Sequence, residues 1–161
     1  MVLGDAILWV GACIVVASIL RAVGTRRLLG AFMVVVLLAG PASALGRAER
    51  LALRAVNEAR VRHGIDTLRA TQRLSRYAER HARRMARARE VFHSDMSFPK
   101  PAGWRCAGEN VGKGRSVLSL HRRFMRSPRH RDNILRGCFE RIGLGIVRAH
   151  GAIWEVQVFV G

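Results

Sequence analysis

The hydrophobic pattern of this 161-residue chain changes its period near Leu135, and this change limits the folds that the chain can adopt. Before Leu135, apolar residues recur every three or four positions, which predicts amphipathic helices over residues 49–63, 72–90 and 116–126. After Leu135 they alternate with polar residues or glycine, which predicts strands over residues 139–148 and 152–160. Helices followed by a terminal sheet indicate an α+β fold in which the helices cover the sheet.

Single residues mark the ends of these elements. Gly64 follows the first predicted helix as a terminator, while Thr71 and Ser116 precede the second and third helices as N-caps. His150 and Gly151 form the predicted turn between the two strands. Residues 108–111 read as a further strand, so we expect the terminal hairpin to complete a sheet that begins there.

The first 44 residues have the composition of an export segment. Two apolar runs, residues 6–20 and 28–45, flank a patch that contains three arginines. In the second run, Arg26 and Arg27 form a charged start, an apolar centre follows, and an A-x-A cleavage motif ends at Ala44. We therefore predict an export signal or N-terminal membrane segments over residues 1–44, with a single domain over residues 45–161.

The first apolar run leaves two interpretations open. This run is shorter than the roughly 20 residues of a spanning helix. Either it is part of a helical hairpin whose basic loop stays in the cytoplasm, or the true start of the protein lies near Val23 and the run is an annotation artefact. Both interpretations place the domain outside the cytoplasmic membrane. The predicted location is thus secreted, extracellular, or anchored by a transmembrane helix with the domain outside.

The chain is strongly basic, with 28 Lys and Arg against 11 Asp and Glu. This charge predicts attraction to anionic surfaces such as lipid or acidic wall polymers. The sequence contains no zinc finger, RNA-binding aromatic motif or clear helix-turn-helix pattern, so nucleic acid is not the favoured partner. We interpret the arginine run of residues 80–89 first as a solvated helix face.

Three polar residues from separate segments form the candidate site: His93, Glu109 and His130. His93 follows the second predicted helix, Glu109 lies in the early strand, and His130 follows the Ser-Pro pair that ends the third helix. Two readings remain open. The three residues bind a divalent metal such as zinc and act in catalysis, with His93 and His130 as ligands, or they form a hydrogen-bonded cluster that connects the elements. A serine nucleophile at Ser94 is a weaker hypothesis.

Cys106 and Cys138 are the only cysteines after the predicted cleavage site. An even number of cysteines in an exported domain favours a disulfide. The alternative is that Cys106 acts as a nucleophile with His130, which requires a reducing compartment.

The segments VNEAR, AERHA, FHS, GENV, SPRHRDNIL, RIGLGIV and WEVQVF occur in this order, and in this combination the chain resembles the CAP superfamily. The resemblance covers residues 49–161 and implies an α-β-α sandwich. It also implies a cleft with two histidines and two acidic residues, and a divalent metal in some members. His93, Glu109 and His130 match three of these four cleft residues. The region before His130 has no carboxylate, so the fourth is missing.

From these observations we expect an exported protein that acts at the cell envelope. The leading expectation is that it binds a lipid, a wall polymer or a protein partner through the His and Glu cleft. The second is a metal-assisted, peptidase-like hydrolase that uses His93, Glu109 and His130. The third is a cationic effector that binds anionic surfaces through its arginines.

Overall fold

The computed structural model describes residues 45–97 and 104–161. Its elements follow the order expected from the sequence, with one additional short helix and one additional short strand. In chain order they are α3 (Arg47–Arg62), β1 (Arg69–Ala70), α4 (Gln72–Ala88), β2 (Ala107–Gly114), α5 (Val117–Arg126), α6 (Pro128–Leu135), β3 (Arg141–Ala149) and β4 (Ala152–Val160).

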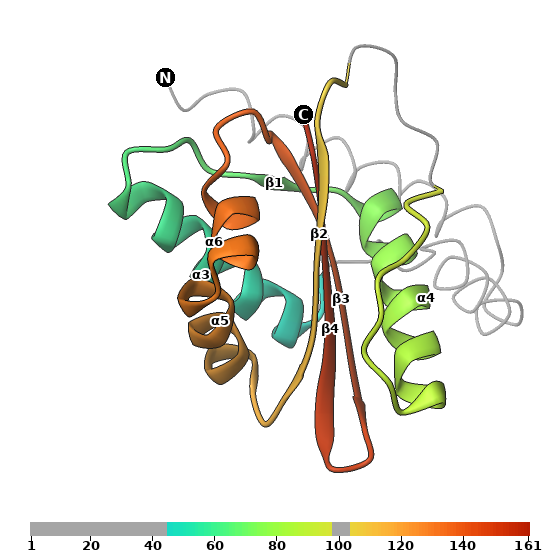
Figure 1. Cartoon of the computed structure of the whole chain (residues 1–161). Helices are drawn as coiled ribbons and strands as arrows, with labels where there is room; N and C mark the ends of the chain where they lie inside the picture. Colours follow the sequence, from blue (N-terminus) through green and yellow to red (C-terminus); the bar gives the residue numbers. More distant parts are fainter. Residues whose placement is uncertain (1–44, 98–103) are drawn as a thin grey trace, which may run out of the picture. The chain divides into compact units, whose positions relative to one another are not determined.

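The strands form one sheet in the order β1-β3-β4-β2, so β2 lies at an edge. β4 pairs antiparallel with both β2 and β3, and β1 adds a short parallel pair to β3. Figure 1 shows α4 on one side of the sheet and α3, α5 and α6 on the other. The predicted α+β class with an α-β-α arrangement is therefore confirmed.

The two faces of β4 contribute to two separate cores, because successive side chains of a strand point to opposite faces. Trp154, Val156 and Val158 pack with the apolar residues of α4. Ile153 and Phe159 pack with those of α3, α5 and α6. β4 is buried along its whole length, which explains why it is the most apolar strand in the sequence.

Two glycines of β3 let α4 lie directly against the sheet. A Cβ atom at Gly143 would approach the backbone of Leu74 to 2.3 Å, and one at Gly145 would approach the backbone of Ala78 to 2.2 Å. Larger residues would force the helix away from β3. Glycine at these positions therefore sets the distance of α4 from the sheet, and with it the position of the segment that follows α4.

Local signals at the element ends agree with the sequence. His150 and Gly151 both have positive φ, 52° and 70°, as a two-residue hairpin of type I′ requires. Gly64 has a φ of 69° just after α3. Ser116 accepts a hydrogen bond from the backbone N–H of Ser119 and forms a capping box with it. Thr71 is the N-cap of α4, without a side-chain hydrogen bond.

The predicted export signal and membrane segments at residues 1–44 lie outside the described residues. Within the described part, no helix is long and apolar enough to span a membrane. The described residues belong to one compact unit.

Candidate functional site

Glu109 lies at the centre of the candidate site, on the edge strand β2. Glu109 is only 7 % exposed. Oε2 accepts hydrogen bonds from His93 Nδ1 at 2.8 Å and from the Ser94 backbone N–H at 2.9 Å, and Oε1 accepts one from the Ser94 hydroxyl at 2.7 Å. Three donors therefore hold this carboxyl group, and all of them come from one dipeptide after α4.

His93 is oriented by this contact. Because the Glu109 carboxylate is an acceptor, His93 Nδ1 carries the proton, and Nε2 of the neutral ring is then the acceptor nitrogen. The His93 side chain is 62 % exposed, so the ring is open to a ligand although its Nδ1 is held by Glu109. Ser94 serves as a donor to Glu109 and accepts a hydrogen bond from the Met96 N–H at 3.2 Å. Its hydroxyl is thus engaged in shaping the turn.

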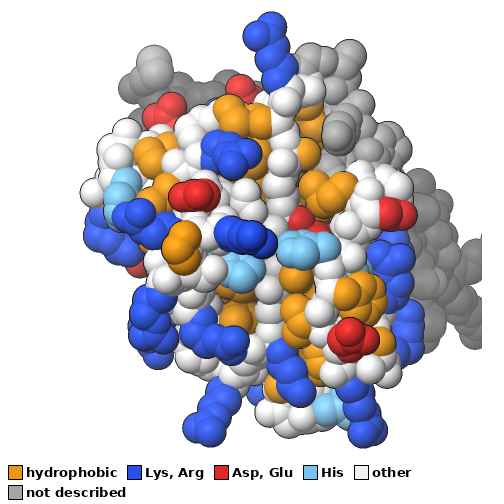
Figure 2. All heavy atoms as spheres, viewed as in Figure 1, with side chains coloured by type: hydrophobic (Ala, Val, Ile, Leu, Met, Phe, Trp, Pro, Cys, Tyr) orange, Lys and Arg blue, Asp and Glu red, His pale blue; other side chains and the backbone are white. Residues whose placement is uncertain are grey.

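His130 approaches the site from α6, on the other side of β2. Its Nδ1 lies 2.9 Å from the Ser127 hydroxyl, and its ring lies 4.9 Å from the ring of Phe124. Partial burial lowers the pKa of His130, and the nearby charges of His93 and Arg123 lower it further. The His130 ring is therefore neutral at pH 7. Figure 2 shows two histidine side chains near each other at the centre of this face.

A buried amide network connects the two sides of this site. Asn110 Nδ2 donates to the carbonyl oxygen of His130 at 3.1 Å and to Gln157 Oε1 at 3.1 Å. Asn133 Nδ2 donates to Asn110 Oδ1 at 3.0 Å and to the carbonyl oxygen of Glu109 at 3.1 Å. These amides fix α6, and therefore His130, against the strand that carries Glu109.

The network ends at Glu155, which is wholly buried on β4. Gln157 Nε2 donates to Glu155 Oε1 at 2.7 Å, and Oε2 has no hydrogen-bond partner among the described residues. Burial raises the pKa of Glu155 to about 7, and the charge of Glu49 contributes in the same direction. Sequence reasoning did not single out Glu155 or Gln157; a Glu and a Gln within an otherwise apolar strand were the available signal.

Whether this site can hold a divalent metal depends on which donor atoms are free to act as ligands. Glu109 is occupied by three hydrogen-bond donors, which leaves the two imidazole rings as candidate ligands. Among the described residues, no group of three or more His, Cys, Asp and Glu side chains is arranged to hold a metal ion. A catalytic zinc site typically has three protein ligands. The described residues therefore do not complete a site with three protein ligands, and metal binding by His93 and His130 stays a prediction.

His121 differs from its expected environment. We expect a half-exposed histidine on the third helix, but His121 is buried in α5, and within the described part of the chain its Nδ1 has no hydrogen-bond partner. Burial lowers the pKa of His121, and the nearby charges of Arg62 and Arg122 also lower it. His121 lies four residues after Val117 and three before Phe124, so it shares the buried face of α5 with them.

Comparison with known proteins shows the family of the chain. The model of CAP, the cysteine-rich secretory protein family, matches residues 53–159. The chain belongs to this family. The matched range includes His93, Glu109 and His130, so the predicted resemblance to the CAP superfamily is confirmed.

A curated relative of this CAP protein is a longer bacterial protein. The uncharacterized protein YkwD of Bacillus subtilis is 28% identical over 128 residues, which are 74% of this chain and 49% of YkwD. The chain thus spans about half the length of this curated relative.

Solved structures support the CAP fold. An extracellular protein with an SCP domain from Bacillus anthracis has a TM-score of 0.59 and 21% identity, covering 69% of this chain and 39% of that protein. An outer surface protein from Borrelia burgdorferi has a TM-score of 0.64 and 14% identity, covering 73% of this chain and 94% of that protein. At these identities the likeness shows the fold alone.

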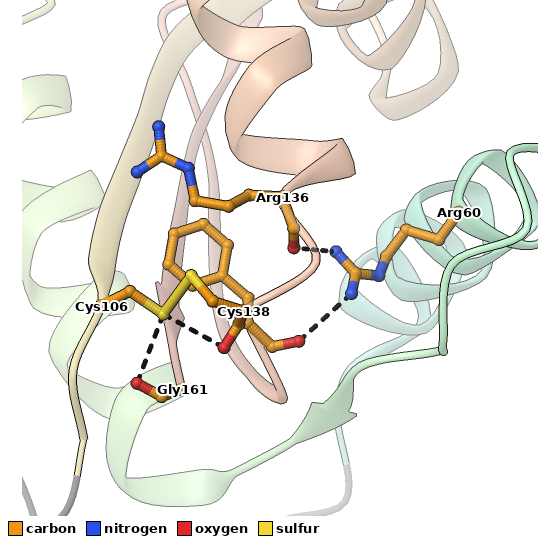
Figure 3. The surroundings of a disulfide bond; sticks show 6 residues. Arg60, Cys106, Arg136, Cys138 and Gly161 are labelled. Atoms are coloured by element: carbon orange, nitrogen blue, oxygen red, sulfur yellow. Dashed lines mark hydrogen bonds between the residues drawn. A yellow bond between two sulfur atoms is a disulfide. The ribbon is translucent and has the colours of Figure 1, made fainter.

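The predicted disulfide between Cys106 and Cys138 is present. It joins the chain just before β2 to the loop between α6 and β3, beside the final residue Gly161 (Figure 3). The two cysteines are 32 residues apart, and the enclosed segment includes α5, α6 and His130. The alternative in which Cys106 acts as a free nucleophile with His130 is therefore wrong for this oxidised state.

Proposed function

We propose that this CAP protein is exported and that it binds a component of the cell envelope through the surface of His93 and His130. The observation that carries the proposal is the hydrogen bonding and burial of the Glu109 carboxylate. Its two oxygens are occupied by His93 and Ser94 and its side chain is buried, so it acts as a positioning group. What remains for a ligand is a pair of oriented imidazole rings on an accessible face.

Two kinds of finding support action outside the cytoplasm. The solved structures include a protein named as extracellular and another named as an outer surface protein. The disulfide between Cys106 and Cys138 is a bond that persists in oxidising compartments. Alkaline phosphatase fused after Gly161 provides the test, because this reporter folds only outside the cytoplasm. An inactive fusion that is stably expressed would contradict export.

The partner of this surface has the chemistry of a hydrogen-bonding envelope component: a wall polymer, a lipid headgroup or an exposed protein segment. Because His93 Nδ1 is engaged by Glu109 and His130 Nδ1 by Ser127, the Nε2 atom of each ring remains to hydrogen-bond hydroxyl and amide groups of a ligand. The neutral state of His130 favours such groups over a fixed anion at this position. A wall polymer carries many hydroxyl and amide groups and is therefore the first ligand to test.

The binding test compares a site variant with a matched histidine control. The full chain is mixed with isolated cell-wall sacculi, and the bound fraction is measured for the wild type, for His93→Ala/His130→Ala and for His63→Ala/His150→Asn. His63 and His150 are exposed histidines at other places in the fold. We expect about tenfold weaker binding in the site variant alone. Equal binding by all three proteins would contradict the proposal.

A metal-assisted hydrolase remains the second candidate, favoured by one contact. His93 donates Nδ1–H to a carboxylate, which is the arrangement that orients many metal-binding histidines. Zinc titration by calorimetry, with His93→Ala/His130→Ala as the control, tests this candidate directly. Micromolar binding that disappears in the variant would support a metal site and justify a screen of peptide substrates. Absence of binding in both proteins would exclude zinc at these histidines.

A further inference from the structure

A hollow of about 410 Å³ lies along the exposed side of α4, and neither His93 nor His130 lines it. Four arginines of α4 line it: Arg80, Arg83, Arg84 and Arg87. Their spacing of three, four and seven residues places them on one helix face. Tyr77 of the same helix and two residues of the following turn, Asp95 and Ser97, complete the lining.

The arginines at this hollow are held in place. His81 is buried beneath them; its Nε2 donates to the carbonyl oxygen of Phe92 at 2.8 Å, which leaves Nδ1 as an acceptor. Arg84 Nη2 donates to this Nδ1 at 3.0 Å. The guanidinium of Arg80 lies 6.0 Å from the ring centre of Tyr77. Ordering the side chains beforehand reduces the entropy that a ligand must overcome when it binds.

The positive charge of the hollow is only partly neutralised. Among the described residues, Arg83 has an ion pair with Glu79, and the other three arginines of the hollow have none. Asp95 is the one carboxylate in the lining, and its Oδ1 already accepts hydrogen bonds from the Tyr77 hydroxyl and from the N–H and hydroxyl of Ser97. The carboxylate therefore stabilises the turn, and it also interacts electrostatically with Arg84. The guanidinium groups of Arg80 and Arg87 remain available to an anion.

We propose that this hollow binds a linear phosphate-bearing polyanion, such as a phosphodiester polymer of the envelope. The planar guanidinium group matches the oxygens of phosphate with two parallel hydrogen bonds. The row from Arg80 to Arg87 extends for about 10 Å along the helix, which exceeds one phosphate group and suits successive phosphates of a chain. None of His93, Glu109 and His130 lines the hollow, so this proposal does not rest on the imidazole surface.

The experiment uses inorganic polyphosphate as the probe and the full chain as the protein. Affinity is measured at several salt concentrations for the wild type, for Arg80→Gln/Arg87→Gln and for the control Arg47→Gln/Arg148→Gln. All four arginines are exposed, and both variants lose the same charge. We expect about tenfold weaker binding for the hollow variant. Its plot of log affinity against log salt should also lose roughly two units of slope, one for each phosphate contact removed.

Two further measurements make the result decisive. Arg80→Lys/Arg87→Lys keeps the charge but removes the forked donors, so it should bind more weakly than the wild type and more tightly than the Gln variant. Equal losses in the hollow variant and the control would overturn the proposal, because net charge would then explain binding. Tighter binding to vesicles of anionic phospholipid or to duplex DNA than to polyphosphate would also overturn it. A thermal melt checks that each variant is folded.

Discussion

Arg60 on α3 donates from Nη1 to the carbonyl oxygen of Arg136 at 2.9 Å, so a buried guanidinium holds the loop that carries Cys138 (Figure 3). The same guanidinium group donates to the carbonyl oxygens of Ile134 and Phe139 at 2.9 and 3.1 Å, and its Nε donates to that of Asp66 at 2.6 Å. Burial lowers the pKa of Arg60, and the charge of Asp66 partly opposes this effect. One side chain thus satisfies four carbonyl groups, one from α6 and three from the loops that follow α3 and α6.

Replacing Arg60 with Met should destabilise the fold strongly. The methionine fills most of the volume but leaves four carbonyl oxygens without their donor, and each buried unsatisfied group is costly. We expect a loss of about 3–5 kcal/mol in the free energy of unfolding, measured by urea denaturation. The matched control is Arg54→Met, because the Arg54 side chain is 70% exposed and makes one surface ion pair. A loss below about 1 kcal/mol in the control is expected, and a similar loss for Arg60→Met would contradict the role assigned to it.

The disulfide provides the next prediction. Cys106→Ser/Cys138→Ser removes a link across 32 residues, and a link of this length contributes about 3–4 kcal/mol by restricting the unfolded chain. The melting temperature of the wild type should fall when a reductant is added, while that of the double variant should be low and insensitive to the reductant. An unchanged melting temperature of the reduced wild type would show that the Arg60 contacts alone hold this loop.

Much of this fold could be predicted from the sequence, because its signals are local. The helix-to-strand change of period, the His150-Gly151 turn and the Ser116 cap each depend on a few adjacent residues. Long-range contacts carry no such signal. Arg60 sits within an amphipathic helix among other arginines, and only the packing of α6 and the following loop makes it a buried donor.

The candidate site, too, could be predicted from the sequence only in part. The motifs around His93, Glu109 and His130 indicated three residues that lie around one edge strand. Their roles followed from contacts that the sequence does not display, above all the two hydrogen bonds from Ser94 to Glu109. The buried chain from Asn110 through Gln157 to Glu155 joins residues up to 47 positions apart, and it became visible only in the fold.

Glu109→Gln should weaken the fold as well as the site. The new amide presents an NH₂ group to donors at Ser94 or His93, so at least one buried hydrogen bond to the carboxylate is replaced by a donor facing a donor. We expect a loss of about 2–3 kcal/mol in the free energy of unfolding. Glu58→Gln, on an exposed surface of α3, is the control and should change stability by less than about 0.5 kcal/mol. Unchanged stability in Glu109→Gln would show that Glu109 is not a positioning group.

Glu155 predicts an unusual dependence of stability on pH. Its pKa rises from 4.5 to about 7 in the folded protein because burial disfavours the carboxylate. The folded state therefore binds this proton more tightly than the unfolded state, and the contribution to stability is fully present below pH 4.5. It is lost as the pH rises from about 4.5 through 7. His121 and His130 act in the opposite sense, since their lowered pKa values reduce stability as the pH falls below about 6.5.

The variant Glu155→Gln isolates the carboxyl group from these histidines. Glutamine keeps an acceptor oxygen for Gln157 Nε2 and removes the ionisation, so the variant should gain stability relative to the wild type as the pH rises. We expect the difference in the free energy of unfolding to shift by roughly 2–3 kcal/mol between pH 4.5 and pH 8. Urea denaturation of both proteins at each pH provides the measurement. A difference that is constant across this range would mean that Glu155 does not change its protonation state on unfolding, and the raised pKa would be refuted.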